Sequence, residues 1–316
     1  MKSQSQCPVL LSFCLVTYNQ EKYVRESVLS AFAQTYSPLE IVLSDDCSTD
    51  RTFEIMRELA AGYRGPHRII LNRNERNLGL GMHASKVWGE LSSGRWLIGA
   101  AGDDISLPER AEAVARAAQQ YPEAACIWSG CDFIDGEGAG LPRSASAGEH
   151  GGIYAYRNTI PAILGATVAY RRDVYSEFGP LGGEVRNEDI VMSLRSLLLG
   201  EFVRIDAPLV KYRKHDSNLS GKFTDGRDKI ERMRFRLGYA HLQQLADLQK
   251  YLEKHPEQYR RIARLRRRVS DNYIVSQFCS AFCFCPSCRL HLVIEALTSP
   301  RYWRIAAARI WKRFWR

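Results

Sequence analysis

The sequence predicts an α/β fold with a mostly parallel, doubly wound sheet, followed by a helical and basic C-terminal appendage. Short aliphatic runs without polar alternation recur along the first part of the chain, and segments with apolar residues at helical spacing separate them. This alternation is typical of buried parallel strands joined by crossover helices. From about residue 227 to the C-terminus the pattern is helical instead, with many lysines and arginines.

The first two expected strands enclose one expected helix. Residues 9–16 form the first apolar run, which Thr17-Tyr18-Asn19-Gln20 breaks. Apolar residues between 24 and 32 then recur at the i, i+4, i+7, i+8 spacing of one helix face. Residues 40–44 form the second run, and an amphipathic segment with apolar residues between 53 and 60 follows it. These segments predict a strand, a helix, a strand and a second helix.

Three more expected strands continue the alternation. Residues 68–71 form the third, and a loop at 77–81 leads from it into a helix. Residues 96–100 form the fourth strand, and 124–129 the fifth. Between these two, Pro108 suits the first turn of a helix, because that turn leaves its N–H positions unpaired in any case. The pattern therefore predicts a parallel sheet with helices on both faces.

Composition divides the chain into two expected domains. We expect the α/β domain over residues 1–225 and a helical region over residues 226–316. Residues 135–152 are rich in Gly, Ser and Ala and are predicted to form a loop. The chain has 316 residues and an apolar fraction of 45%, which suffices for a substantial core.

The net charge of +9 points to an anionic partner such as a nucleic acid, a nucleotide or a membrane surface. The excess is concentrated: residues 254–268 hold seven Lys or Arg against one Glu, and residues 301–316 hold six and no acid. No RNA-stacking or helix-turn-helix signature accompanies the charge, so we expect no nucleic-acid partner.

The cysteines and the N-terminus favour a reducing compartment. The nine cysteines form no small-domain disulfide pattern, and residues 1–6 lack an apolar signal core. No stretch approaches the roughly 20 apolar residues that span a bilayer. We therefore expect a cytoplasmic protein, peripheral on the inner face of the cell membrane.

Two expected strands end in paired acids, Asp45-Asp46 and Asp103-Asp104. Parallel strands share a direction, so both pairs should lie on one edge of the sheet, where open α/β sheets bind ligands. Such oxygen ligands suit Mg²⁺ or Mn²⁺ holding a substrate diphosphate. The alternatives are helix capping, by Ser48 or Asp50 for the first pair and before Pro108 for the second.

Six short motifs follow one another within about residues 8 to 220. They are Thr17-Tyr18-Asn19, Gln34-Thr35-Tyr36, Glu40-Ile41-Val42, Asp45-Asp46-Cys47-Ser48-Thr49-Asp50, Asn77-Leu78-Gly79 and Gly102-Asp103-Asp104 with Pro108. In this order and spacing they resemble the motifs of glycosyltransferase family 2. The resemblance implies a GT-A fold, which is Rossmann-like, and transfer of a hexosyl-type sugar from a nucleotide-diphosphate donor with inversion.

The resemblance also implies roles for individual residues. Asp46 resembles the acid that recognises the donor base, Asp103 would contact the ribose or sugar, and Asp104 would ligate the metal. The family's usual acid-x-acid motif has its first acid where Ala101 stands here. We therefore expect weak metal affinity without donor. The donor-binding residues that the resemblance implies are Thr17, Tyr18, Asn19, Asp46, Asn77, Asp103 and Arg213.

Inversion needs a general base that deprotonates an acceptor hydroxyl. Asn187-Glu188-Asp189-Ile190 precedes an apolar helical pattern and resembles the Glu-Asp motif of the family, in which an acid is the base. We expect Asp189 to be this base, with Glu188 as the second choice. A helix start would keep the pKa of Asp189 low, and both acids could simply favour the helix dipole instead.

A basic segment at 211–220 resembles a later family segment that closes over the diphosphate. Arg213 and Lys214 would offset phosphate charge, and His215 could reach the metal. The alternative is a solvated basic loop.

The C-terminal region carries two further patterns. Residues 300–316 place Trp and Ile on one helix face and Arg and Lys on the other, which predicts a helix in an anionic membrane interface or, alternatively, one packed on the protein's own core. Four cysteines could bind zinc or form a free apolar turn. They are Cys279, Cys283, Cys285 and Cys288.

On this basis we expect a metal-dependent, inverting glycosyltransferase that acts in cell-envelope polysaccharide biosynthesis on a cell-surface glycan or lipid-linked acceptor. The alternative is a catalytically silent member of the same fold that binds a nucleotide sugar or a partner. Ala101 is the feature that supports the alternative.

Overall fold

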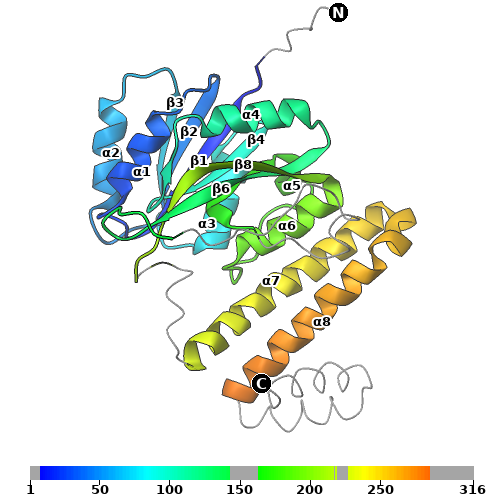
Figure 1. Cartoon of the computed structure of the whole chain (residues 1–316). Coiled ribbons are helices and arrows are strands. Elements are labelled where there is room, and N and C mark those ends of the chain that lie inside the picture. The colour runs from blue at the N-terminus through cyan, green and yellow to red at the C-terminus, as the bar shows by residue number, and fades with distance from the viewer. Residues whose placement is uncertain (1–7, 143–162, 217, 219–226, 285–316) are drawn as a thin grey trace, which may run out of the picture. The chain divides into compact units, whose positions relative to one another are not determined.

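The computed structural model describes residues 8–142, 163–216, 218 and 227–284, and in the last segment the side chains of residues 237–273 (Figure 1). The chain forms two compact units. The first unit comprises residues 1–183 and 188–222, and the second comprises residues 184–187 and 223–316. The thiols of the four cysteines that could bind zinc and the expected membrane helix at 300–316 lie outside the described part of the structure. The four are Cys279, Cys283, Cys285 and Cys288.

An eight-stranded sheet forms the centre of the first unit, in the order β3-β2-β1-β4-β7-β6-β8-β5. The predicted α/β class is therefore confirmed. The strands are β1 (Leu11–Thr17), β2 (Leu39–Asp45), β3 (Arg68–Arg73), β4 (Trp96–Ala101), β5 (Ile105–Ser106), β6 (Ala124–Ile134), β7 (Val168–Arg171) and β8 (Glu201–Arg213).

The sheet is mixed rather than uniformly parallel. Strands β3, β2, β1 and β4 are parallel to one another, as the aliphatic runs predict. Strand β7 runs antiparallel to both β4 and β6, β6 and β8 are parallel, and β5 is antiparallel to β8. The sequence pattern does not indicate three of the strands, β5, β7 and β8. Strands β5 and β7 have two and four residues, which is too short for a recognisable periodicity. Strand β8 has 13 residues, but its buried and exposed positions do not alternate regularly.

Helices cover both faces of this sheet, as Figure 1 shows. One face shares a core with α1, α2 and α4, and η1 and α6 contact strands from the other. Consecutive residues of β1, such as Phe13 and Cys14, point to opposite faces of the sheet, and both are buried because helices cover both faces. The helices are α1 (Val24–Phe32), α2 (Thr52–Gly62), α3 (Leu80–Lys86), η1 (Val87–Leu91), α4 (Arg110–Gln120), η2 (Gly165–Thr167), α5 (Asp173–Ser176) and α6 (Glu188–Leu199).

Strand register brings the acidic motifs to one edge. Thr17 lies opposite Asp45 in the β1–β2 pair, and Val16 lies opposite Ala101 in the β1–β4 pair. The carboxyl ends of β1, β2 and β4 therefore meet, as the parallel direction of the strands predicts. The next turn also behaves as expected, because Asp50 Oδ1 accepts a hydrogen bond from Thr52 N at the start of α2 at 3.0 Å.

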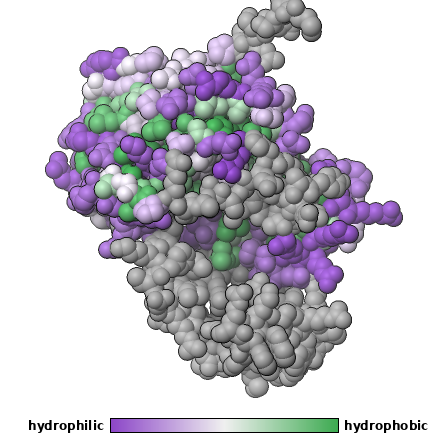
Figure 2. All heavy atoms as spheres, in the orientation of Figure 1, coloured by the Kyte–Doolittle hydropathy of each residue, from purple (hydrophilic) through white to green (hydrophobic). Residues whose placement is uncertain are grey.

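On the face drawn in Figure 2, hydrophilic side chains cover most of the described surface, and hydrophobic ones form small patches between them. None of the described helices is both long enough and apolar enough to cross a membrane.

The second unit contains a pair of long helices, α7 (Arg227–Lys254) and α8 (Tyr259–Phe284), joined by the short helix η3 (Pro256–Gln258). The two long helices contact each other along their length. Leu248, Ile262 and Leu265 are buried, at the helical spacing that the sequence shows. The helical character expected for this part of the chain is therefore present in its described residues.

A buried glutamate, Glu40, connects β1 and β2 with the segment before β4 at the amino-terminal edge of the sheet through hydrogen bonds. Glu40 on β2 accepts hydrogen bonds from Ser12 Oγ at 2.6 Å, Ser93 Oγ at 2.7 Å and Gly94 N at 3.2 Å. Burial raises its pKa, but these donors outweigh burial, and the net pKa is lowered. Glu40 therefore stabilises the fold while it is ionised, and this contribution disappears as the pH falls through its lowered pKa.

Replacing Glu40 with Ala should lower the free energy of unfolding by about 2–4 kcal/mol, because several buried donors lose their acceptor. Urea denaturation at neutral pH measures this loss. Glu112→Ala is the matched control, since Glu112 forms an exposed i,i+4 pair with Arg116 and a long, exposed hydrogen bond with Thr35 Oγ1. Its loss should cost less than about 0.5 kcal/mol. Equal stability of the two variants would contradict this account of Glu40.

Candidate functional site

The first acid of the β2 motif closes a turn. Asp45 is fully buried, and its carboxylate accepts hydrogen bonds from Ser48 N at 2.9 Å, from Ser48 Oγ, and from Thr17 Oγ1 at 3.3 Å. Arg73 Nε lies 3.6 Å from the same carboxylate. Asp45, for which the sequence suggests no role, therefore holds the turn after β2 against the end of β1.

The second acid, Asp46, organises a neighbouring loop. Its Oδ1 accepts from Asn74 Nδ2 at 2.8 Å and from Leu78 N at 2.9 Å, and its Oδ2 accepts from Gly79 N at 2.9 Å. Asn77 Oδ1 also accepts from Gly79 N, and Gly79 has a φ of 77°, which favours glycine. Asp46 thus fixes the Asn77-Leu78-Gly79 motif with both of its carboxylate oxygens.

The remaining β1 residues of the expected donor site differ in exposure. Thr17 is buried, and its hydroxyl group contacts Asp45. Tyr18 is 45% exposed at the same edge. Asn19 has a φ of 52°, and its side chain accepts a hydrogen bond from Thr49 N at 2.9 Å, which connects the loop after β1 with the loop after β2.

The turn after β4 depends on a close approach to β1. A Cβ atom at Gly102 would lie 2.4 Å from Thr17 Cγ2 and 2.4 Å from Gln20 Oε1, so only glycine fits there. Gly102 N donates to Val16 O at 3.1 Å, which holds the turn against the end of β1. The two acids that follow, Asp103 and Asp104, are both buried.

Asp104 carries the least satisfied carboxylate of this edge. Its Oδ1 accepts from Arg213 N at 2.8 Å, whereas its Oδ2 is buried without a hydrogen-bond partner among the described residues. Burial and the neighbouring Asp103 raise the pKa of Asp104 well above its usual value. A buried carboxylate in this position is stable only as the neutral acid or beside a cation.

The Arg213 side chain, at the end of β8, connects the acidic turn with two other segments. Its Nε donates a hydrogen bond to Asp103 O at 2.9 Å, and its Nη1 lies 3.3 Å from the carbonyl oxygens of Asp135 and Gly136. Its Nη2 donates a hydrogen bond to the carboxylate of Glu26. The guanidinium also stacks over the Tyr23 ring. Because these partners surround it, Arg213 acts in this structure as a clamp on the Asp103-Asp104 turn.

His215 and Asn218 hold the other acid. His215 Nε2 lies 3.0 Å from Asp103 Oδ2, and Asn218 Nδ2 donates to the same oxygen at 3.2 Å. The imidazole ring packs on Tyr23 with a centroid distance of 4.6 Å. His215 therefore joins the acidic turn through Asp103 rather than through Asp104.

The residues around Asp104 fit a divalent cation as partial ligands. Asp104 Oδ2 offers a buried oxygen that lacks a donor, and oxygen ligands suit Mg²⁺ and Mn²⁺. Within the part of the chain that the structure describes, no group of three or more His, Cys, Asp or Glu side chains is placed to hold a metal ion. Such an ion would therefore need ligands from water or from a substrate as well.

A second acidic pair begins α6. Glu188 and Asp189 lie beside Gly165, where a Cβ atom would come within 3.0 Å of Glu188 Oε1 and 3.5 Å of Asp189 Cβ. Asp189 Oδ1 accepts a hydrogen bond from Ile190 N at 2.8 Å. The buried hydroxyl group of Tyr170 has no hydrogen-bond partner among the described residues.

The pKa of Asp189 differs from the low value that the sequence predicts. A helix start alone predicts a low pKa for Asp189, but burial raises it to about 6, although backbone N–H groups including that of Gly165 oppose the rise. Burial and the charge of Asp189 raise the pKa of Glu188 to about 8. Near neutral pH the pair therefore shares about one proton between its two carboxyl groups.

The structure thus gathers the expected residues into three groups. Asp103, Asp104, Arg213 and His215 form one connected cluster, and Glu188 with Asp189 forms a separate pair. The expected donor residues at the ends of β1 and β2 and in the loop that Asp46 organises form the third group. Its members are Thr17, Tyr18, Asn19, Asp46 and Asn77.

Sequence reasoning missed several partners of these residues. Glu26 and Tyr23 are far from Arg213 along the chain, so no local pattern connects them. Asn218 lies within the expected basic segment. Its side-chain amide can donate a hydrogen bond to a carboxylate, and this was the signal in the sequence that could have indicated its contact with Asp103. The orphan hydroxyl group of Tyr170 has no counterpart in any sequence motif.

Comparison with solved structures identifies the fold. Residues 1–349 of TarS of S. aureus, solved with UDP-GlcNAc, superpose with a TM-score of 0.57 at 17% identity, over 84% of this chain and 79% of that chain. A mannosyltransferase of Pyrobaculum calidifontis, solved with GDP-Man and Mn²⁺, gives a TM-score of 0.51 at 16% identity, over 96% of this chain and 87% of its own. These likenesses confirm the predicted GT-A fold.

Comparison with curated sequences gives partial matches. An uncharacterized glycosyltransferase of Methanocaldococcus jannaschii is 32% identical over 131 residues, which cover 41% of this chain and 44% of that relative. The chain spans 36% of the length of the putative glycosyltransferase EpsE of Bacillus subtilis and 62% of that of an uncharacterized protein of Mycobacterium tuberculosis.

A model of one protein family matches residues 12–179, which is more than half of the 316 residues, and its description is glycosyl transferase family 2. This region contains the motif after β1, the acid pairs after β2 and β4, and the loop that Asp46 organises. The chain therefore belongs to glycosyltransferase family 2.

Proposed function

We propose that this protein is an inverting, divalent-metal-dependent glycosyltransferase. It moves a hexosyl-type sugar from a nucleotide-diphosphate donor to a hydroxyl group of a cell-surface glycan or a lipid-linked acceptor. The observation that carries the proposal is the buried Asp103-Asp104 pair, in which Asp104 Oδ2 lacks a donor among the described residues. A divalent cation would satisfy that oxygen and, when bound, would neutralise charge on the departing diphosphate.

In the proposed reaction, Asp189 removes the proton from the acceptor hydroxyl group. The hydroxyl oxygen then attacks the anomeric carbon from the side opposite the diphosphate, the bond to the diphosphate breaks, and the proton remains on Asp189. The raised pKa of about 6 supports this role, because it leaves Asp189 ionised at neutral pH yet more basic than an ordinary aspartate. Glu188, with a pKa of about 8, stays protonated beside it.

The other acids position the donor site in this proposal. Asp46 holds the loop at Asn77-Leu78-Gly79, so that the donor base meets a preformed edge. Arg213 fixes the backbone of Asp103 and the side-chain orientation of Asp104. His215 would ligate a metal ion through Nε2 only after leaving Asp103, which makes Asp104 the stronger candidate ligand.

A catalytically silent, nucleotide-sugar-binding or partner-binding protein is the second candidate. Ala101 ends β4 where the family motif has an acid, and the described residues hold no three-ligand metal group. A screen of UDP, dTDP and GDP sugars separates the two candidates, because only an enzyme hydrolyses or transfers the sugar of a donor that it binds.

Asp104→Asn should lower turnover by about 100-fold or more, because the charge that holds the cation is lost. Transfer from the donor identified in the screen, with Mn²⁺ present, measures the effect. Asp206→Asn is the control, since the Asp206 side chain is 88% exposed and should leave turnover unchanged. Full activity of Asp104→Asn would contradict the proposal that Asp104 ligates the cation.

Asp189→Asn should lower kcat by about 10² to 10⁴-fold, while the KM for the donor changes little, because the base acts on the acceptor. In the wild type, kcat should fall as the pH drops through about 6, since protonated Asp189 cannot accept the proton. Steady-state kinetics over a pH series measure both effects.

Glu188→Gln is the matched variant for this prediction. It preserves a neutral side chain beside Asp189 and should retain most activity at neutral pH. The opposite pattern, in which Glu188→Gln is inactive and Asp189→Asn is active, would make Glu188 the base.

We further propose peripheral association with the inner face of the cell membrane through residues 300–316, on the basis of their composition. Removing these residues should weaken sedimentation with anionic vesicles and leave donor hydrolysis unchanged. Unaltered vesicle binding would contradict the proposed anchor.

A further inference from the structure

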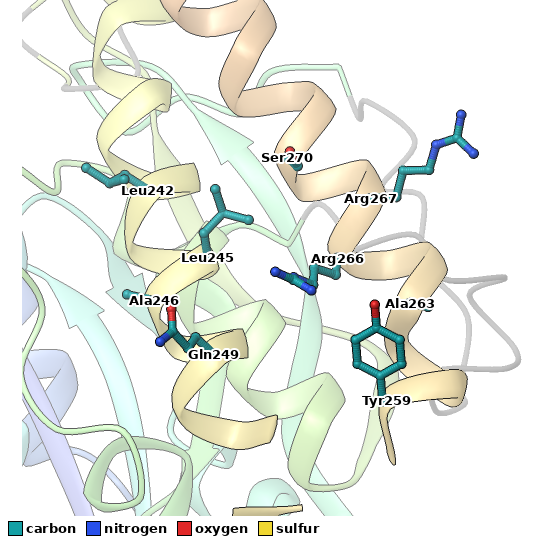
Figure 3. Close-up of a pocket in the computed structure, with 9 residues that line it drawn as sticks. All are labelled: Leu242, Leu245, Ala246, Gln249, Tyr259, Ala263, Arg266, Arg267 and Ser270. Atoms are coloured by element: carbon teal, nitrogen blue, oxygen red, sulfur yellow. The ribbon is translucent and has the colours of Figure 1, made fainter. Parts of the chain in front are cut away.

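A groove runs between the two long helices of the second unit (Figure 3). Its volume is about 800 Å³, and residues at helical spacing on each helix line it. Those that the argument uses are Leu242, Leu245 and Ala246 of α7, and Tyr259, Arg266 and Arg267 of α8. The groove lies far along the chain from the family motifs, which end before residue 220, and no step of the proposed reaction uses it.

Large apolar side chains on both helices of the groove are exposed to solvent. Leu242 is 47% exposed and Tyr259 is 53% exposed, although both are large and hydrophobic. Leu245 and Ala246 continue the apolar wall along α7. Exposed apolar side chains that gather on one surface mark a contact site, whereas scattered ones do not.

The other component of the groove is positive charge. Six of the nine residues from 260 to 268 are arginine and none is acidic. Figure 3 shows the guanidinium group of Arg266 reaching toward α7, while that of Arg267 extends outward. Neither arginine forms an ion pair within the part of the chain that the structure describes, and no acidic residue lines the groove.

We infer that this groove docks the protein on a bilayer that contains anionic phospholipid. Leu242 and Tyr259 enter the interface, where an aliphatic chain and an amphipathic ring are both favourable. Arg266 and Arg267 then meet headgroup phosphates, to which a guanidinium group donates two parallel hydrogen bonds. This inference stands independently of the proposed catalysis, because none of these residues belongs to the site.

Charge and side-chain type favour an anionic bilayer over the three other possible occupants of the groove. Residues 301–316 of the same chain hold six basic residues and no acid, so they repel the arginines of α8. A second copy of the basic α8 surface is repelled in the same way. Nucleic acid would favour stacking on aromatic rings, but among the described residues that line the groove Tyr259 is the one that is aromatic.

The test is sedimentation of the full-length protein with two kinds of vesicle, phosphatidylcholine alone and phosphatidylcholine mixed with an equal part of phosphatidylglycerol. The wild type should bind the mixed vesicles and lose binding at high salt. The double variant Arg266→Glu, Arg267→Glu should bind them at least about 10-fold more weakly, since each basic residue near an anionic surface contributes attraction. Leu242→Ser should weaken binding while the net charge is unchanged.

The matched control is Arg57→Glu with Arg64→Glu, which changes the net charge equally at two exposed arginines of the first unit. This control should bind almost as the wild type does, and circular dichroism should show all variants folded. Equal binding by Arg266→Glu, Arg267→Glu and the wild type would overturn the inference. It would also fail if the double variant lost affinity for a single-stranded oligonucleotide but kept its affinity for vesicles, or if the control lost as much vesicle binding as the double variant.

Discussion

The parallel pairing of β1 with β2 and β4 is the constraint on which the rest of the first unit depends. It brings the carboxyl ends of three strands to one edge and thereby buries four aspartates in a small region. Buried carboxylates must find donors or cations. Ser48 supplies donors to Asp45, the loop at Asn77-Leu78-Gly79 supplies them to Asp46, and Arg213 braces the turn after β4. One oxygen of Asp104 stays without a donor among the described residues, and the proposed chemistry starts from it.

Much of this edge could be predicted from the sequence because its causes are local. Uninterrupted aliphatic runs indicate buried strands, and the shared direction of parallel strands places their acidic ends together. The clamp could not be predicted, because Arg213 and Glu26 are 187 positions apart and only the folded sheet joins them. Strand β7 escaped prediction as well, since four residues show no periodicity, and it adds an antiparallel strand to a sheet that is otherwise mostly parallel.

The second acidic pair shows where local reasoning gives the wrong sign. Glu188 and Asp189 begin a helix, and a helix start by itself stabilises a carboxylate and lowers its pKa. The fold places both acids in a buried position beside Gly165, and burial outweighs the helix start. The sequence shows the helix pattern but not the burial, which depends on η2 and β7. The same burial raises the pKa of both acids, so the pair retains a proton near neutral pH.

The central claim is that Asp104 holds a divalent cation together with the donor diphosphate. A crystal structure of the protein with a nucleoside diphosphate and Mg²⁺ tests it most directly. The account predicts an ion about 2.1 Å from Asp104 Oδ2, with diphosphate oxygens and water completing its ligands. An ion held by the diphosphate and water alone, with Asp104 Oδ2 still without a partner, would contradict it.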